Sequence, residues 1–413
     1  MLPRSLTVPP PARNLAVLQL SSRRAFAAVA YAFFAVTAFS TAPSSLYGLY
    51  ARTEGFSTLD LTLAYAVYAA GTIASLVLVG HVSDWYGRRA VLIPAIAIAI
   101  LADAVFLGSR SLTGLFAARI LTGLAVGAAV ATATAYLTDF IGRADGVSAR
   151  RAGIVATVAN IGGLASGPLI AGVLARYEPH ALTLSYQVFL GALLLALVLV
   201  AFSPEINPPV GRAPRYHPQR LAIPADGRGR FTAAITGVFL AFGIFGLFAG
   251  LAGTLLAGPL HQHSPALIGL TIFLAFGTGV LVQTTTTAWP AHRLTVAGLF
   301  PMLGGLALLV ISAWTSPPSL GLFLAAAIGV GAGGGAIFRA SLTLVIQSSG
   351  AHQRAGALAT FFTAGYAGLS IPVVAIGFVL QHVSPRVTLL YFGVAVAVGI
   401  LAAAPVLVRP PRG

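Results

Sequence analysis

Residues 80–89 of this chain read Gly80-His81-Val82-Ser83-Asp84-Trp85-Tyr86-Gly87-Arg88-Arg89. This short charged loop lies between two apolar stretches, at about 61–79 and 90–107, and each stretch is long enough to cross a bilayer. Arginines held directly beside two membrane spans favour the cytoplasmic side. The loop therefore predicts a membrane protein and sets the expected orientation of its helices.

The composition supports an integral membrane protein. Of the 413 residues 57% are hydrophobic and 8% are charged, whereas about a quarter of a soluble domain is charged. The chain has no cysteine, which excludes disulfides and thiolate metal sites, and no lysine to complete a phosphate-binding G-x-x-x-x-G-K-[ST] motif. The net charge of +15 comes from arginines in short loops, so we expect no nucleic-acid partner. We also expect no cofactor and no bound metal.

Apolar windows of about 20 residues predict an all-α integral membrane fold with twelve transmembrane helices. The windows fall at about 25–47, 60–80, 90–109, 113–137, 152–174, 183–203, 232–256, 266–287, 295–314, 319–345, 356–381 and 387–408. Between the sixth and the seventh lies the longest polar stretch, which is rich in proline and arginine. We expect the following division of the chain: an N-terminal tail 1–24, a six-helix bundle 25–203, a linker 204–230, a second bundle 231–408 and a C-terminal tail 409–413.

The arginines define a topology. With both termini in the cytoplasm, 18 arginines fall on the inner side and four on the outer side. This asymmetry follows the positive-inside rule and predicts a multi-pass protein of the cell (inner) membrane.

A short internal repeat favours two related halves. Residues 151–157 and 354–360 match at five of seven positions, and each copy is followed by a proline, Pro168 and Pro372. Two copies of the same orientation are expected for halves related by an axis along the membrane normal. Chance similarity in alanine- and glycine-rich sequence is the alternative.

Three motifs carry a resemblance to a known family. The loop 80–89 is similar to the motif G-x-L-A-D-x-x-G-R-R of the major facilitator superfamily. Arg119-x-x-x-Gly123-x-x-x-Gly127 resembles the second motif of that family. The third, Gly163-x-x-x-Gly167-Pro168-x-x-Ala171-Gly172, resembles a motif found mainly in drug:proton antiporters, with Ala171 in place of one glycine. The resemblance covers nearly the whole chain and implies two pseudo-symmetric six-helix halves.

The loop motif is expected to act as a gate. Asp84 is its acidic residue and can accept hydrogen bonds from a neighbouring helix N-terminus, where the macrodipole is positive. The resemblance implies that this neighbour is the eleventh span, in the other half. Arg88 and Arg89 are expected to pair with Asp84 or Asp139, while Gly80 and Gly87 permit the sharp turn. A solvated loop that only sets topology is the alternative.

Ionisable side chains inside spans mark function by default. Asp103 and Arg119 lie in neighbouring antiparallel spans, each about six residues from the outer end. At about 1.5 Å per residue they lie at similar depth, which predicts an ion pair that protonation of Asp103 opens. A static structural pair is the alternative. Arg339 is expected to reach toward the membrane interface, with cavity lining as its alternative.

Small and polar residues complete the expected site. Gly163, Gly167, Pro168 and Gly172 are expected to bring helices into close contact at the seam between the halves. Candidates for the substrate cavity are uncharged polar and aromatic residues: Tyr31, Tyr65, Tyr68, Asn160, Gln187, Gln283 and Tyr366. A cavity with so few charges suits an amphipathic or apolar solute.

We therefore expect a monomeric secondary transporter that exports a small amphipathic or drug-like compound in exchange for protons. Its partners are the small-molecule substrate, protons and the lipid bilayer, and it is not an enzyme. Asp103 is the only acid well inside a span. Proton coupling therefore either runs through Asp103 or is absent. An uncoupled facilitator or uptake transporter is the first alternative, and a non-transporting membrane receptor or scaffold is the second.

Overall fold

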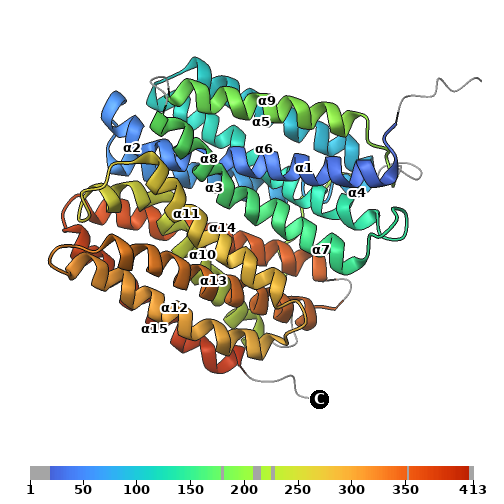
Figure 1. The fold of residues 1–413 in the computed structure, drawn as a ribbon. Helices are drawn as coiled ribbons and strands as arrows, with labels where there is room; N and C mark the ends of the chain where they lie inside the picture. Colours follow the sequence, from blue (N-terminus) through green and yellow to red (C-terminus); the bar gives the residue numbers. More distant parts are fainter. Residues whose placement is uncertain (1–18, 178–180, 208–214, 225–227, 351–352, 409–413) are drawn as a thin grey trace, which may run out of the picture.

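The computed structural model describes residues 19–177, 181–207, 215–224, 228–350 and 353–408. The expected tail 409–413 and residues 1–18 of the expected N-terminal tail lie outside this range. Within it, twelve helical segments are long and apolar enough to span a membrane. Figure 1 shows the helices before residue 204 packed in one layer and those after residue 227 in a second layer beneath them.

The first part of the chain forms helices of unequal length. They are α1 (Ser22–Thr41), α2 (Pro43–Glu54), α3 (Thr58–Leu78), α4 (Ser83–Tyr86), α5 (Arg88–Gly108), α6 (Leu112–Asp139), α7 (Ala149–Thr157), the π-helical turn η1 (Val158–Gly162), α8 (Gly163–Tyr177) and α9 (Ala181–Ala201). The helices α1 and α2 form one bent span, and α7, η1 and α8 form another.

The described residues after the linker form six long helices. They are α10 (Arg228–Ala257), α11 (Pro265–Thr285), α12 (Ala291–Trp314), α13 (Leu320–Ser348), α14 (Arg354–Val379) and α15 (Pro385–Leu407). Because α10 already begins at Arg228, the linker is slightly shorter than the expected 204–230. The layers meet where α3 packs on α14 and α8 packs on α11.

Local chemistry explains several helix boundaries. Ser57 caps α3 by accepting a hydrogen bond from the backbone N–H of Asp60, while the Asp60 carboxylate accepts one from the backbone N–H of Ser57. Asp60 therefore has a structural partner at the end of its helix. Proline at Pro43 begins α2 and separates it from α1, because proline lacks the N–H that would continue the helix.

The helix bundle has a linker side and a far side. The linker side holds α4, the loops 79–87 and 140–148 and the described linker residues 202–207 and 215–224. The far side holds the end of α2 and the loop between α10 and α11. In Figure 1, α2 lies at the left and α4 at the right.

Candidate functional site

On the far side the two layers are in close backbone contact. A Cβ atom on Gly172 would lie 2.3 Å from the carbonyl oxygen of Pro265, and one on Gly269 would lie 2.3 Å from the carbonyl oxygen of Pro168. Only glycine permits such an approach between helices. The contact between α8 and α11 therefore joins the two layers at this end, next to a cavity of about 430 Å³ that α2, α3, α10 and α11 line.

The glycine motif of α8 divides between two neighbours. A Cβ on Gly163 would lie 2.0 Å from Thr37 Oγ1, and one on Gly167 would lie 1.9 Å from the Ala38 carbonyl oxygen, so these two glycines pack on α1. Pro168 and Gly172 instead contact α11. The expected seam between halves is thus formed by Pro168 and Gly172, whereas Gly163 and Gly167 hold α8 against its own layer.

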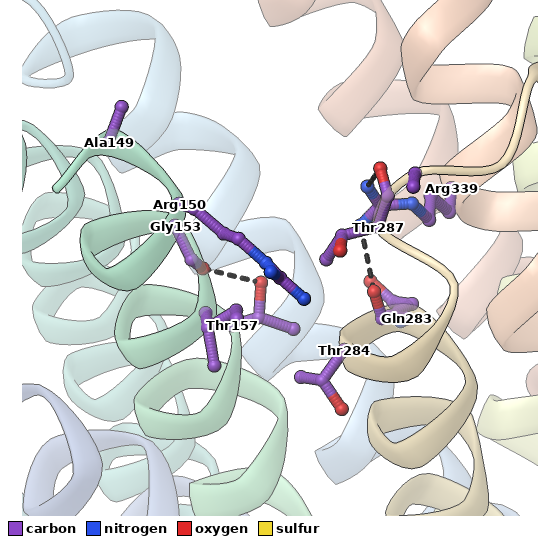
Figure 2. Close-up of a pocket in the computed structure, with 10 residues that line it drawn as sticks. Ala149, Arg150, Gly153, Thr157, Gln283, Thr284, Thr287 and Arg339 are labelled. Carbon is purple, nitrogen blue, oxygen red and sulfur yellow. Dashed lines mark hydrogen bonds between the residues drawn. The ribbon is translucent and has the colours of Figure 1, made fainter.

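On the linker side the layers separate around a vestibule of about 570 Å³. Residues of α7, with Thr157 as one of its polar members, form one wall, and residues of α11, its following turn and α13 form the other. Figure 2 shows Arg150 and Gly153 on one wall and Thr284 and Arg339 on the other. The volume lies within the range of small-molecule sites in proteins.

Arg339 belongs to the vestibule. Its Nη1 donates to the Gln283 carbonyl oxygen at 2.8 Å and its Nη2 to the Thr287 carbonyl oxygen at 2.9 Å. Its Nε is buried and has no hydrogen-bond partner among the described residues. The structure therefore favours the alternative expectation for Arg339, cavity lining, because carbonyl oxygens of α11 and its following turn hold it at the wall of the vestibule.

A narrower inner cavity of about 50 Å³ lies next to the vestibule, and Gln283 lines both spaces. Five of the expected cavity residues lie on its wall: Tyr65, Tyr68, Asn160, Gln283 and Tyr366. The rest of the wall is mostly apolar and includes five phenylalanines that the sequence did not single out: Phe242, Phe245, Phe276, Phe338 and Phe362. No sequence signal separates a phenylalanine that faces a cavity from one that faces lipid.

Asn160 reaches this cavity from an irregular turn. It lies in η1, where the π-helical geometry inserts an extra residue into the span, a feature often found at functional sites. Thr37 Oγ1 donates to the Ala159 carbonyl oxygen at 2.9 Å and supports the turn from α1. The Asn160 side-chain oxygen has no partner among the described residues, so it remains available to a ligand.

Two of the expected cavity residues lie elsewhere. The Tyr31 hydroxyl donates to the Ala192 carbonyl oxygen at 3.2 Å, which turns the ring toward α9. Gln187 is exposed on the outer surface of α9. Both assignments to the cavity are wrong, because α9 packs on the outside of its layer, on α1, α5 and α8.

Arg119 lies behind the aromatic wall of the inner cavity. Its side chain is fully buried, and its guanidinium carbon lies 4.3 Å from the ring centroid of Tyr68 and 5.8 Å from that of Tyr65. Nη1 donates to the Ser40 carbonyl oxygen at 2.6 Å, while Nε and Nη2 have no partner among the described residues. Arg119 therefore places an uncompensated positive charge next to the cavity wall.

Asp103 is also fully buried, and it does not pair with Arg119. Neither carboxyl oxygen has a hydrogen-bond partner among the described residues, and it lies in α5, which packs on α6 and α9 rather than on the second layer. The predicted ion pair is wrong because equal depth in neighbouring spans does not fix the direction in which each side chain points. Asp103 also does not line the inner cavity.

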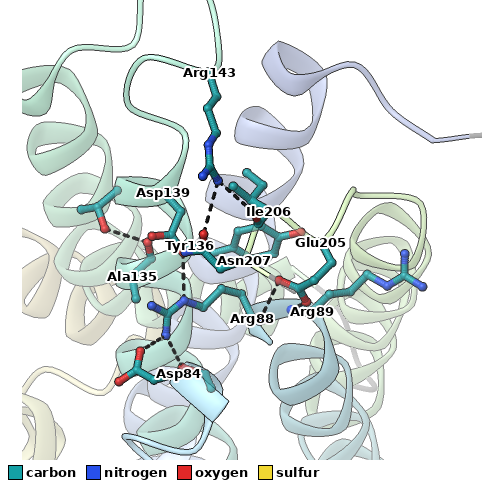
Figure 3. A network of polar contacts seen from close by, with 12 residues as sticks. Asp84, Arg88, Arg89, Ala135, Tyr136, Asp139, Arg143, Glu205, Ile206 and Asn207 are labelled. Atoms are coloured by element: carbon teal, nitrogen blue, oxygen red, sulfur yellow. Dashed lines mark hydrogen bonds and ion pairs between the residues drawn. The ribbon is translucent and has the colours of Figure 1, made fainter. Parts of the chain in front are cut away.

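The loop motif forms a compact network within the first layer (Figure 3). Arg88 Nε donates to Asp139 Oδ2 at 2.9 Å, and Arg88 Nη1 donates to Ser83 Oγ at 2.8 Å and pairs with the Asp84 carboxylate. Gly87 has a φ of +97°, which favours glycine. Arg89 does not join these carboxylates but donates to the Ser203 carbonyl oxygen at 3.2 Å.

Glu205 is a member of this network that sequence reasoning missed. Its carboxylate accepts hydrogen bonds from the backbone N–H groups of Arg88 at 3.0 Å and Arg89 at 2.8 Å, which are free donors at the start of α5. A carboxylate at a helix N-terminus is also favoured by the macrodipole. The available signal was an isolated acid directly after the sixth span.

Contact between the loop motif and α14 runs through the linker. Gln219 N–H donates to the Val77 carbonyl oxygen at 2.8 Å, near the end of α3. Ala222 N–H donates to Thr360 Oγ1 at 3.1 Å, and Thr360 Oγ1 donates to the Ala222 carbonyl oxygen at 3.0 Å. The expected hydrogen bonds from the α14 N-terminus to Asp84 are not formed, since the Asp84 side chain is 60% exposed and pairs with Arg88.

The loop motif also contacts the linker through aromatic rings. The imidazole of His81 lies 4.6 Å from the ring of Trp85 and 5.6 Å from that of His217, measured between centroids. Burial lowers the pKa of His81 below its usual value, and the charge of His217 acts in the same direction, whereas the backbone of His217 and the charge of Asp84 act in part against it. The neutral imidazole is therefore the form that packs here.

Comparison with known proteins is consistent with this architecture. The model of the Major Facilitator Superfamily matches residues 25–317. The tetracycline resistance protein, class G, of Vibrio anguillarum is 26% identical over 230 residues, which are 55% of this chain and 57% of that protein. The multidrug resistance protein MdtL of Escherichia coli is 39% identical over 84 residues, which are 20% of this chain and 21% of that protein.

Solved structures share the fold at low sequence identity. The nucleoside transporter NupG has a TM-score of 0.69 at 13% identity, with 92% of this chain and 99% of that chain covered. The human organic anion transporter MFSD10 has a TM-score of 0.66 at 17% identity, with 94% of this chain and 100% of that chain covered.

Proposed function

This chain belongs to the major facilitator superfamily and is a membrane transporter rather than an enzyme, and we propose that it moves a small amphipathic compound by alternating access. The observation that carries the proposal is the asymmetry between the two sides. At the far side the layers are in backbone contact through Gly172 and Gly269, beside a cavity of about 430 Å³. On the linker side they are separated by the larger vestibule of about 570 Å³. Rocking of one layer on the other closes the vestibule and opens the far side.

The linker side is the cytoplasmic side in this proposal, and the membrane is the inner membrane. The excess of arginines in the segments of that side supports the orientation, with both chain ends in the cytoplasm. Export is supported by the resistance proteins that match parts of this chain. The vestibule and the inner cavity are formed within one chain, which supports a monomer as the functional unit.

The gate of this cycle is the loop motif. With the vestibule open, Asp84 is held by Arg88 and is largely exposed. When the layers close on the linker side, Asp84 becomes free to accept hydrogen bonds from the N-terminus of α14. Gly80 and Gly87 shape the turn, while Arg88 and Arg89 connect it to α6 and to the end of α9.

Proton coupling through Asp103 is the second element of the proposal. A fully buried carboxyl group without a partner is costly in a membrane protein and is a candidate proton carrier. It acts through the packing of α5 on α6, the helix that carries Arg119, because it does not line the cavity itself.

An uncoupled facilitator or uptake transporter is the second candidate. One observation favours it: none of the acidic residues that the structure describes lines the vestibule or the inner cavity. No described carboxylate in these two spaces could therefore bind a proton in exchange for the substrate.

The deciding experiment is performed in proteoliposomes with an imposed pH gradient and an internal pH-sensitive dye. Amphipathic compounds are added to the wild type, to Asp103→Asn and to the matched control Glu54→Gln, which changes an acid outside the bundle core. If the protein is an antiporter, adding a substrate should trigger proton flux in the wild type and in Glu54→Gln, but not in Asp103→Asn. Substrate transport that is the same with and without the gradient, and the same in Asp103→Asn, would contradict antiport and support the uncoupled facilitator.

A further inference from the structure

The space between the layers carries positive charge, and no carboxylate of the described residues compensates it. Arg150 and Arg339 line the vestibule, and Arg119 lies behind the wall of the inner cavity. None of the described acidic residues lines either space, and residues 227–413 contain no acidic residue at all. A cleft lined by charges of one sign concentrates ions of the opposite sign.

The two vestibule arginines come from opposite walls. Arg339 is fixed by two carbonyl oxygens, which orient the guanidinium but leave its full charge in place. Arg150 lies in the first turn of α7 and is exposed, and Figure 2 shows its guanidinium extending into the vestibule. Guanidinium groups bind the two oxygens of a carboxylate, sulfonate or phosphate in a planar arrangement.

The deeper end of the same path is aromatic. Phe245 and Phe276 lie 4.7 Å apart between ring centroids, and Phe242 lies 5.5 Å from Phe338 and 6.1 Å from Tyr366. These rings surround a space of about 50 Å³, which a flat ring enters only when the surrounding side chains move apart. Gln283 lines both this space and the vestibule, so the ring and the acidic group of one molecule can lie in adjacent spaces.

We propose that this site binds an aromatic organic anion, with its acidic group between Arg150 and Arg339 and its ring among the phenylalanines of the inner cavity. The proposal rests on the proposed function, because it assigns the substrate class of that same cavity. An organic cation of similar shape is rejected by the arginines and finds no carboxylate to pair with. A neutral ring compound binds through the aromatic part alone.

The test compares three probes of nearly equal shape: naphthoate, naphthylmethanol and naphthylmethylammonium. Their equilibrium binding to the purified full-length protein is measured by calorimetry at low and at physiological salt. We expect naphthoate to bind at least tenfold more tightly than either of the other two. Equal affinities for the three compounds, tighter binding of the cation, or no measurable binding of the anion would overturn the proposal.

Charge variants locate the site. Arg150→Gln and Arg339→Gln are each expected to weaken naphthoate binding at least tenfold and to leave naphthylmethanol unchanged. Arg339→Lys guards against a folding defect, because it keeps the charge and is expected to retain most of the affinity. Arg293→Gln, on the same side but outside the vestibule lining, is the matched control and should bind naphthoate like the wild type. Unchanged naphthoate affinity in both vestibule variants would overturn the proposal.

Measurements of binding and of transport test the anion site and the transport function separately. Arginine-dependent binding of naphthoate without movement across proteoliposomes would support the anion site and count against transport of this class. Transport of the cation alone, without the anion, would support the transporter and overturn the anion site.

Discussion

Arg88 and Asp139 are joined by a hydrogen bond of 2.9 Å between Nε and Oδ2, which ties the start of α5 to the end of α6. The same guanidinium pairs with Asp84. The two carboxylates differ in burial, because the side chain of Asp139 is 17% exposed and that of Asp84 is 60% exposed. This difference separates a structural contact from one that can be released.

Asp139→Asn and Asp84→Asn should therefore have different effects on stability. Loss of a charged hydrogen bond in a half-buried site lowers the free energy of unfolding by about 2 kcal/mol, which we expect for Asp139→Asn. Asp84→Asn should cost under about 1 kcal/mol because its pair is exposed, yet it should reduce transport if Asp84 closes the gate. Denaturation in detergent and transport in proteoliposomes check both. Full transport by Asp84→Asn would remove it from the gate.

The close approach of α8 and α11 predicts a steric effect. In Gly172→Ala the new Cβ meets the Pro265 carbonyl oxygen, so the far-side contact must loosen, at a cost of about 1–3 kcal/mol. Gly191→Ala is the control, since a Cβ there meets no atom within 4 Å. The melting temperature should fall for Gly172→Ala and should stay constant or rise slightly for Gly191→Ala. Equal behaviour of the two variants would argue against a tight seam.

The contact between His81 and His217 predicts a pH dependence of linker attachment. Burial lowers the pKa of His81 in the attached state, whereas a released His81 has its ordinary value of about 6.5. The attached state therefore binds fewer protons than the released one. Attachment is at full strength above about pH 6.5 and weakens as the pH falls toward the lowered pKa of the attached state.

Trp85 reports this change because its ring contacts both histidines. In a chain with Trp289→Phe and Trp314→Phe, its fluorescence should change as the pH falls below about 6.5. The same chain with His81→Phe should lose most of that change, since an apolar ring keeps the packing and cannot take up a proton. An identical titration in both chains would show that His81 is not the group responsible.

The separation of Asp103 from Arg119 predicts additive effects. Because the two side chains share no contact, the stability losses of Asp103→Asn and Arg119→Gln should add to within about 0.5 kcal/mol in the double variant. Chemical denaturation in detergent of the wild type, the two single variants and the double variant provides the double-mutant cycle. A coupling energy above about 1 kcal/mol would indicate that the pair forms in another state of the cycle.

The sequence predicted the helices better than the site. Twenty-residue apolar windows located all twelve spans, because the bilayer requires a minimum length of apolar helix. The break after Thr41 and the π-helical turn at Val158–Gly162 were not predicted, since a window of apolar residues locates a span but does not show where its helix is interrupted. Both irregularities place residues at the inner cavity, Thr41 and Asn160 among them.

The site was predicted in part because depth in a membrane is easier to infer than helix rotation. Tyr65 and Tyr31 are both tyrosines within apolar spans, so the sequence does not distinguish them. Only the packing of α1 on α9 turns Tyr31 away from the cavity. Asp103 and Arg119 were correctly placed inside the bundle, but residues on an α-helix rotate by about 100° each, so similar depth left their directions open. Glu205 was missed because its partners are backbone N–H groups, which carry no sequence signal.

The central claim is that transport requires the vestibule between α7 and α11 to close. The chain has no cysteine, so Gly153→Cys and Thr284→Cys, on opposite walls, can be joined with a short bifunctional thiol reagent. Transport of a compound found in the proton-flux assay is measured before and after joining, with each single-cysteine variant as control. Alternating access predicts that joining the walls stops transport while the single variants continue. Full transport by the completely joined protein would contradict it.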